Sequence, residues 1–312
     1  MRTNFGLGQW REPERFVLML TGVGLLLNAV LLLRGTLALD WQGYAVVALA
    51  AIGIGAVGQF YRISGRSDRL GDALIVTSLW IAFPAVFVIF NYLQMPVANA
   101  PIDAQLMWVD SLYGYEWTAW IEWAAYNPFA TNVLRFAYTT FMPQVLLLVL
   151  VLSLTGRQAT LDRMLVTMVV TSIIAVCFWS LFPTHGAKAY ATLSPAVEMA
   201  ANPVVTTEYG RELLRMAAEG AGYLSPSDVK GLIALPSYHA VIACYIARAA
   251  WDVPYLRWPL LTLSLLTLPA CMVHGGHHLI DVPAGIVVFL VGDWMARRVI
   301  ANKPVAVGQV TA

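Results

Sequence analysis

Charged residues are scarce in this chain. Asp, Glu, Lys and Arg make up 12% of its 312 residues, whereas hydrophobic residues make up 59%. A soluble globular protein usually has about 25% charged residues, so this chain has too little polar surface to cover a soluble particle. The lipid bilayer must therefore solvate much of it. The net charge is only +1, which argues against a surface that binds nucleic acid.

Cysteine is also rare. The chain has three cysteines, Cys177, Cys244 and Cys271, and all of them lie in apolar stretches. An odd number of cysteines in such stretches is not a disulfide framework, so the redox compartment is left undetermined.

Eight apolar segments are present, and a helix needs roughly 20 residues to cross a bilayer. We therefore expect an all-α integral membrane protein with about eight transmembrane helices, of which the sixth is the shortest. The segments are 16–33, 43–61, 73–93, 134–154, 165–182, 239–251 with its upstream flank, 258–273 and 282–300.

The basic residues predict an orientation. Most of the 19 Lys and Arg residues fall in loops on the same side as the N-terminus, and such loops are usually cytoplasmic. We expect both termini to be cytoplasmic, with the loops 94–133, 183–238 and 274–281 on the outer side. That side is the periplasm, across the plasma (inner) membrane, if the chain is bacterial, and a lumen or the exterior if it is eukaryotic.

The outer loop 94–133 is rich in Trp and Tyr. Trp117, Trp120, Ile121 and Ala124 follow the spacing of one helix face, which predicts a short helix lying in the membrane interface, where amphipathic aromatic rings are favoured. A membrane-anchoring belt is the simpler interpretation, and a binding surface can coexist with it if a lipid enters sideways.

All five histidines fall in the last 130 residues, on the expected outer side. Histidine titrates near neutral pH, so it suits the roles of acid, base and nucleophile. His239 ends the segment Leu-Pro-Ser-Tyr-His, and His185 stands alone. The other three lie in His-Gly-Gly-His-His-Leu-Ile-Asp, residues 274–281. This concentration on one face suggests a reactive site.

Each histidine segment also has a purely structural interpretation. Ser237 is a good helix N-cap, and the first turn after it could bind phosphate with His239 at the rim; equally, Pro-Ser could simply start a helix. His277 and Asp281 are four residues apart, so a helix starting at about Leu279 would let Asp281 fix the His277 tautomer. Alternatively, Asp281 only satisfies the helix dipole. His278 would point elsewhere.

Together the two segments resemble the type 2 phosphatidic acid phosphatase superfamily. The order Pro-Ser-x-His, inward helix, return helix, His-x-x-x-Asp carries the resemblance, which covers about residues 73–300. It is closest to the aureobasidin-resistance branch of inositol phosphorylceramide synthases, which is inositolphosphotransferase-like and acts in sphingolipid metabolism. The supporting residues are 182–184, 235–239, 276–282 and the acidic, aromatic stretch around Asp110 and Trp117.

The resemblance implies an organisation and a mechanism. Residues 1–72 would hold two transmembrane helices, 73–302 a six-helix catalytic core and 303–312 a cytoplasmic tail. His277 would attack phosphorus to form a phosphohistidine, Asp281 would orient it, and His239 would protonate the leaving oxygen. No cofactor or metal is needed in this scheme.

The phosphate-binding residues are less well defined, because the chain departs from the superfamily here. Ala270 and Cys271 occupy the places of the usual Ser-Arg pair, and no arginine follows Lys188 in the usual spacing. A transferring phosphoryl group needs cationic or hydrogen-bonding partners. Our candidates for phosphate or substrate binding are Ser237, Tyr238, Lys188, His185, His274, Arg215 and Lys230.

The function expected is a membrane-embedded phosphotransferase that acts on a lipid phosphate or a phospholipid headgroup. A lipid phosphate or polyprenyl pyrophosphate phosphatase of the same superfamily is the alternative, because water and an alcohol attack the same intermediate. The partners are a lipid substrate and the bilayer, and the oligomeric state stays open. In another class, His274, His277, His278 and Asp281 could ligate a divalent ion, which would make the chain a metal- or haem-binding membrane protein.

Overall fold

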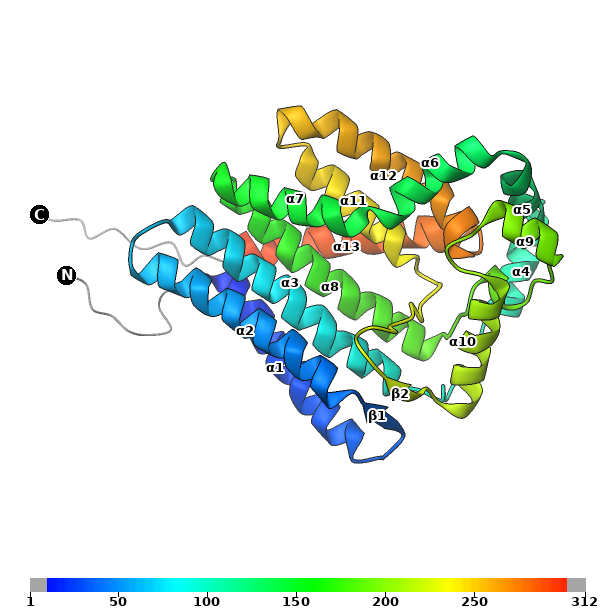
Figure 1. The fold of residues 1–312 in the computed structure, drawn as a ribbon, viewed down its shortest axis with the longest axis horizontal. Helices are drawn as coiled ribbons and strands as arrows, with labels where there is room; N and C mark the ends of the chain where they lie inside the picture. Colours follow the sequence, from blue (N-terminus) through cyan, green and yellow to red (C-terminus); the bar gives the residue numbers. More distant parts are fainter. Residues whose placement is uncertain (1–9, 302–312) are drawn as a thin grey trace, which may run out of the picture.

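The computed structural model describes residues 10–301, which form a bundle of long helices with shorter helices gathered at one end (Figure 1). Within these residues, five helices are long and apolar enough to cross a membrane, or six if one bent pair is a single span. The expected all-α membrane fold is therefore confirmed. The five are α1 (Glu12–Leu32), α2 (Trp41–Ile63), α3 (Asp68–Tyr92), α8 (Gln158–Leu181) and α12 (Pro254–Gly275). The expected tail 303–312 lies outside the described residues.

The bent pair is α6 (Pro128–Thr139) and α7 (Phe141–Leu154), whose axes differ by 48°. Pro143 explains the break, because a proline inside a helix removes one backbone hydrogen bond and clashes with the carbonyl four residues earlier. That carbonyl belongs to Thr139, the last residue of α6. The segment 134–154, expected to be one span, is therefore divided between two helices that meet at Thr140.

Two of the eight expected spans do not qualify by length and composition. Helix α11 (Tyr238–Ala250) has 13 residues, or about 20 Å at 1.5 Å per residue, whereas the hydrocarbon core is about 30 Å thick. Helix α13 (Asp281–Ala301) has 21 residues but carries Asp293, Arg297 and Arg298 in its second half. Both helices nevertheless lie inside the bundle, with α13 packed along α8 and α11 (Figure 1).

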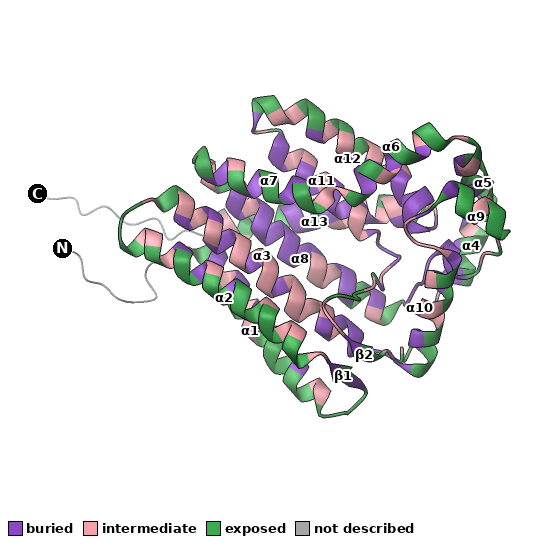
Figure 2. Cartoon of the chain, in the orientation of Figure 1, coloured by how far each residue is buried: buried purple, intermediate pink, exposed green. Residues whose placement is uncertain are grey.

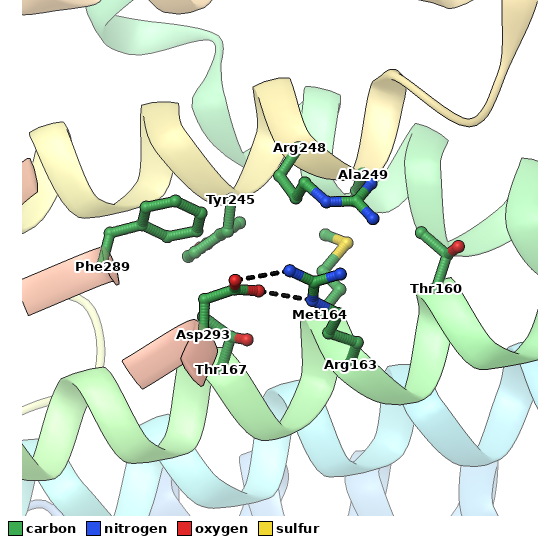
Figure 3. Close-up of a pocket in the computed structure, with 9 residues that line it drawn as sticks. All are labelled: Thr160, Arg163, Met164, Thr167, Tyr245, Arg248, Ala249, Phe289 and Asp293. Carbon is green, nitrogen blue, oxygen red and sulfur yellow. Dashed lines mark hydrogen bonds and ion pairs between the residues drawn. The ribbon is translucent and has the colours of Figure 1, made fainter. Parts of the chain in front are cut away.

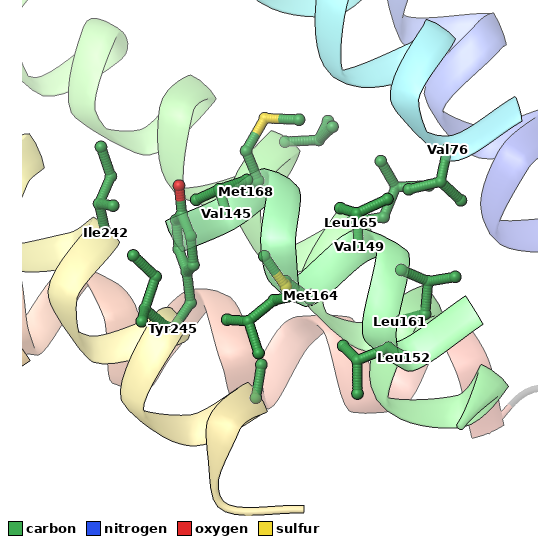
Figure 4. Packing of buried hydrophobic residues seen from close by; sticks show 14 of the residues in the cluster. Val76, Val145, Val149, Leu152, Leu161, Met164, Leu165, Met168, Ile242 and Tyr245 are labelled. Carbon is green, nitrogen blue, oxygen red and sulfur yellow. The ribbon is translucent and has the colours of Figure 1, made fainter. Parts of the chain in front are cut away.

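Helix α8 forms the centre of the bundle. It is buried on most of its surface, whereas α1 and α2 expose one side (Figure 2). Figure 4 shows Leu161 and Leu165 of α8 packed among apolar side chains of the neighbouring helices. Large apolar residues such as Leu26 (71% exposed) and Ile52 (68% exposed) face outward, as expected for helices that lipid solvates.

Charged side chains pair at the end of the bundle that holds the α2–α3 turn. Arg62 donates to Glu14 (Nη1–Oε2, 2.8 Å) and to Asp72 (Nε–Oδ1, 2.8 Å), which joins α1, α2 and α3. Figure 3 shows a second pair, in which Arg163 of α8 meets both carboxylate oxygens of Asp293 in α13, each at 2.5 Å. Asp293 thus forms a bidentate ion pair with Arg163 between two helices, which is a strong geometry for a salt bridge.

The opposite end, which we call the site end, carries the short elements. They are α4 (Asp103–Leu112), α5 (Trp117–Tyr126), the 3₁₀ turn η2 (Ala187–Ala189), α9 (Pro195–Ala201) and α10 (Thr207–Glu219). Two strands that the sequence did not indicate also lie here: β1 (Leu37–Leu39) pairs in parallel with β2 (Gly222–Leu224). Because β1 joins α1 to α2, the pairing ties the first two helices to the loop after α10.

Helix α5 confirms the short helix expected in the 94–133 loop, but its apolar stripe points inward. Of the four residues in the predicted stripe, Trp117, Ile121 and Ala124 are buried, whereas Trp120 is 37% exposed. The indole Nε1 of Trp117 donates to the carbonyl of Met272 (2.8 Å). Packing against α9 and α12 covers this face, so the stripe is part of the protein core. Trp123 stands on the other side of α5 and is 41% exposed.

Loss of the Arg62 guanidinium should destabilise the bundle. In Arg62→Met, the buried Glu14 and its neighbour Asp72 lose a cation, which should lower the free energy of unfolding by about 3 kcal/mol. Arg15→Met is the matched control, because Arg15 is half exposed and lies 4.0 Å from Glu12; it should change stability by less than about 0.5 kcal/mol. Unfolding of the detergent-solubilised variants measures both values, and equal losses would contradict this role.

Candidate active site

The two histidine segments meet where α11 and α13 begin. The backbone N–H of Ser237, just before α11, donates to the carbonyl of Asp281, the first residue of α13 (2.9 Å). Gly285 permits this approach, because a Cβ at that position would lie 2.4 Å from the Ser237 carbonyl oxygen. Segments 40 residues apart in the sequence are therefore held together by the backbone.

Three side chains form a hydrogen-bonded line at this junction. The Nδ1 of His277 lies 3.0 Å from Oδ2 of Asp281, and its Nε2 lies 3.3 Å from Oγ of Ser237. All three residues are buried. Because a carboxylate can only accept, the proton of a neutral His277 belongs on Nδ1, which leaves a lone pair on Nε2. Ser237 also caps α11, since its Oγ accepts from the backbone N–H of Ala240 (3.5 Å).

Helix α13 begins at Asp281, two residues after the expected start at Leu279. His277 therefore lies in the turn between α12 and α13, not on a helix face. The conformation of this turn, and not a shared helix face, brings the side chains of His277 and Asp281 together. Gly276 takes a left-handed conformation (φ +63°) at the end of α12, which suits glycine, and Oδ2 of Asp281 also accepts from the backbone N–H of His278 (3.0 Å).

A cavity of about 330 Å³ opens beside this line. His277, His239 and Lys188 contribute its titratable and basic side chains, and Tyr138 and Phe141 contribute aromatic walls. Lys188 is buried, and its Nζ donates to the carbonyl of Gly275 (3.2 Å). Burial lowers the pKa of Lys188 to about 8, although Asp281 and Asp103 act in the opposite direction. At neutral pH the cavity thus contains the Lys188 ammonium together with two imidazole rings.

The bend between α6 and α7 positions His239. Its ring stacks on Tyr138 (centroids 4.1 Å apart, planes at 20°) and meets the edge of Phe141 (5.1 Å, 86°). These two aromatic residues flank the break at Thr140, where α6 ends and α7 begins. Neither residue could be singled out from the sequence, because aromatic residues are common throughout the apolar segments.

Residues 104–295 match a family model described as the PAP2 superfamily. The chain belongs to the PAP2 superfamily. The match includes both histidine segments and Lys188, begins inside α4 and leaves out the first three long helices. It confirms the superfamily that the motifs predicted, and membership indicates an enzyme of the phosphatase or phosphotransferase type. No curated protein and no solved structure matches the chain.

Three other candidates lie near the PAP2 site but turn to other partners. The hydroxyl of Tyr238 faces α8, where it donates to the carbonyl of Met168 (3.1 Å). His274 lies 3.1 Å (Nε2) from the carbonyl oxygen of Thr131. His185 pairs through Nδ1 with Asp103 (3.2 Å). None of the three lines the cavity described above.

Arg215 and Lys230, which the sequence placed among the phosphate-binding candidates, lie elsewhere. Arg215 pairs with Glu212 on the exposed face of α10 (Nη2–Oε1, 2.7 Å), and Lys230 pairs with Asp228 (Nζ–Oδ1, 2.8 Å). Both line a separate surface hollow of the PAP2 protein. Their spacing to acidic neighbours explains this position, since such pairs are typical of a solvated helix face or loop.

The histidines expected as possible metal ligands do not converge. His274 faces the carbonyl of Thr131 in α6. His277 faces Asp281, and His278 faces Asp110. Among residues 10–301, no group of three or more His, Cys, Asp or Glu residues is arranged to hold a metal ion. His278 points away from the cavity, as expected, although it lies in a turn and not on a helix. Its two carboxylate partners were not anticipated.

A methyl group on Gly275 should disable the site. In Gly275→Ala, the new Cβ would lie 2.6 Å from Cδ2 of His277, so the imidazole must move. A displacement of about 1 Å in a reacting group can lower a rate about 100-fold, and we expect a loss of this size in phosphate release from a lipid phosphate or in headgroup transfer. Gly22→Ala is the matched control, because a Cβ there meets nothing within 4 Å. Equal activity of the two variants would contradict the assignment of His277.

Proposed function

We propose that this PAP2 protein is a membrane phosphotransferase that forms a phosphohistidine on His277 and takes its phosphoryl group from a lipid phosphate or phospholipid headgroup. The observation that carries the proposal is the line Ser237–His277–Asp281, which opens on a cavity shared with His239 and Lys188. A nucleophile, an orienting carboxylate, a second imidazole and a cation are the groups that two-step phosphoryl transfer requires.

In the first step, the lone pair on Nε2 of His277 attacks phosphorus while the bond from phosphorus to the leaving oxygen breaks. Asp281 accepts the Nδ1–H hydrogen bond and stabilises the positive charge that develops on the ring. Burial beside His277 and Lys188 lowers the pKa of His239, so its ring is neutral before the donor binds. It takes up a proton as the anionic donor binds and gives that proton to the leaving oxygen. Lys188 and the first-turn N–H groups of α11 offset the negative charge of the phosphoryl oxygens.

In the second step, an alcohol or water attacks the phosphorus of the phosphohistidine. His239, now neutral, accepts the proton of the attacking hydroxyl, and the phosphorus–nitrogen bond breaks. His277 regains its lone pair on Nε2, and the site returns to its starting state. Hydrolysis and transfer differ only in which hydroxyl enters, so the lipid or polyprenyl pyrophosphate phosphatase remains the alternative.

The charge of the cavity favours a phosphodiester donor. Lys188 is the only Lys or Arg residue among the cavity-lining residues in the described chain. A phosphodiester carries one negative charge, whereas a phosphomonoester carries up to two near neutral pH. One buried cation neutralises the first fully and the second only in part. This supports transfer of a phospholipid headgroup, as expected for the inositolphosphotransferase-like branch.

We also propose that the site end faces the periplasm or a lumen. The described arginines of the α2–α3, α7–α8 and α11–α12 turns lie at the opposite end of the bundle (Figure 1). Such clusters favour the cytoplasmic side. Arg2 and Lys303, which add to the same bias in the sequence, lie outside the described residues.

Labelled phosphorus should be trapped on His277. With a phospholipid donor carrying ³²P in its headgroup phosphate, the acid-quenched wild type should carry acid-labile, alkali-stable label, as phosphohistidine does. His277→Ala should abolish the label because the attacking nitrogen is gone, and His239→Ala should slow both its appearance and its decay. Arg215→Gln is the matched control outside the cavity and should be labelled normally.

Undiminished label in His277→Ala would rule out this nucleophile. Addition of candidate alcohols to the labelled wild type then separates transfer from hydrolysis: a new labelled lipid identifies a transferase, and free labelled phosphate or phosphorylated headgroup identifies a phosphatase.

Lys188 predicts a pH dependence of binding. Its pKa of about 8 means that the ammonium is present below pH 8 and is lost as the pH rises above it. We expect KM for an anionic lipid to rise about tenfold for each unit above pH 8, with a smaller effect on kcat. Lys188→Met should have a high KM that no longer changes over this range. A KM that is flat from pH 7 to 9.5 in the wild type would contradict the role of Lys188.

A further inference from the structure

His278 lies between two carboxylates that both come from α4. Its Nδ1 is 2.7 Å from Oδ2 of Asp110, and its Nε2 is 3.3 Å from Oδ1 of Asp103. The ring is fully buried, and so is Asp103 apart from 1% of its surface. The two aspartates are separated from His278 by 168 and 175 positions in the chain. This bridge therefore joins α4 to the turn that carries His277.

Hydrogen-bonding rules fix the protonation state of the bridge. An ionised carboxylate can only accept, so both ring nitrogens of His278 must donate, and the ring is an imidazolium. Burial alone would lower the pKa of His278, but the hydrogen bonds to Asp103 and Asp110 outweigh it and raise the pKa to about 9. Burial likewise opposes ionisation of Asp103, yet hydrogen bonds from His185 and His278 hold its pKa well below the usual range.

The bridge is surrounded by further hydrogen bonds to the same turn, from α4 and from the loop between α4 and α5. The backbone N–H of Leu279 donates to Oδ1 of Asp110 (2.9 Å), and the hydroxyl of Tyr115 donates to the carbonyl of His277 (3.0 Å). The backbone N–H of His278 donates to Asp281 (3.0 Å), the carboxylate that also holds the His277 ring. Three successive residues of the turn are thus fixed from outside it.

Asp103 reaches the other side of the cavity as well. Its Oδ1 accepts from the backbone N–H groups of His185 and Gly186, each at 2.9 Å. These residues lead directly into η2, which carries Lys188, and the backbone N–H of Lys188 donates to the carbonyl of Gly276 (3.4 Å). One buried carboxylate therefore fixes both the segment with the cation and the turn with the nucleophile.

We propose that Asp103, Asp110 and His278 are positioning residues that hold His277 and Lys188 in register with each other. The inference rests on the proposed function and adds a structural unit, α4 with its two aspartates, to the residues the reaction needs. None of the three lines the cavity, so they act through the backbone of the turn and through Asp281.

If His278 positions the turn through its charged form, kcat should fall at alkaline pH, separately from the effect of Lys188 on KM. The groups that face His278 are Asp103 and Asp110 of α4 and Asp281 of α13; His185 and Tyr190 share Asp103 with it. As the pH rises through about 9, His278 loses one proton, and one carboxylate then faces a nitrogen lone pair. We expect kcat to fall over this range, whereas the loss of charge on Lys188 raises KM from about pH 8.

Two variants and a matched control test the proposal. His278→Gln can donate to only one of the two carboxylates, and Asp110→Asn keeps the shape of the aspartate without its charge. Glu122→Gln removes an exposed carboxylate from the neighbouring α5 and should behave like the wild type. In the full-length protein in detergent, we expect both bridge variants to lower kcat and the rate of ³²P labelling of His277 by about 10- to 100-fold, with KM changed less than about twofold. In His278→Gln the fall in kcat near pH 9 should disappear.

A measurement independent of activity keeps the test decisive. In ¹⁵N-histidine-labelled protein, NMR should show an imidazolium at pH 7.5 that is absent from His278→Gln and therefore belongs to His278, and Asp110→Asn should make it titrate at lower pH. A neutral His278 in the wild type, or normal kcat and labelling in a folded His278→Gln, would overturn the positioning role. If the wild type shows the imidazolium but no label on any histidine, the proposed function fails and the bridge stands only as a structural contact.

Discussion

The hydrogen bond between His277 and Asp281 is the interaction on which the site depends. The Asp281 carboxylate holds the nucleophile candidate in one tautomer, and its backbone carbonyl binds Ser237 at the start of α11. The same residue begins α13. One aspartate therefore joins two distant motifs, orients a ring and starts a helix. Because it is buried, its negative charge needs these donors, so the arrangement is stable only when the whole set is present.

The bilayer explains why this chemistry lies at one end of the bundle. Polar groups in the hydrocarbon region cost free energy unless they are paired. The charged side chains discussed above lie near the two ends of the helix bundle. At one end they form the ion pairs of Arg62 and Arg163, which fix the helices against one another. At the other end they form the cavity and the His278 bridge. The apolar centre around α8 keeps the two ends at a fixed distance.

Local patterns in the sequence predicted the parts that depend on local geometry. The N-cap position of Ser237 was predictable because a serine before an apolar helix can bind its first N–H groups. The four-residue spacing of His277 and Asp281 kept the two side chains close, although a turn and not a helix face brings them together. Long-range contacts were not predictable. Nothing in the sequence pairs His278 with Asp110, which lies 168 residues away, or places Tyr138 against His239 across a helix break. The inward stripe of α5 was misjudged for the same reason: an apolar face fits lipid or protein equally well.

The departures of this chain from its superfamily follow from this arrangement. The resemblance implies arginines near the nucleophile, but Ala270 and Cys271 stand there, and both are buried in apolar packing. In the proposed mechanism Lys188 is the one lysine or arginine that faces the phosphate, so its position matters more than it would within a cluster of arginines. Asp103 fixes that position through His185 and Gly186 while it also holds the His278 bridge. A site with one cation thus needs a rigid frame, and α4 provides it.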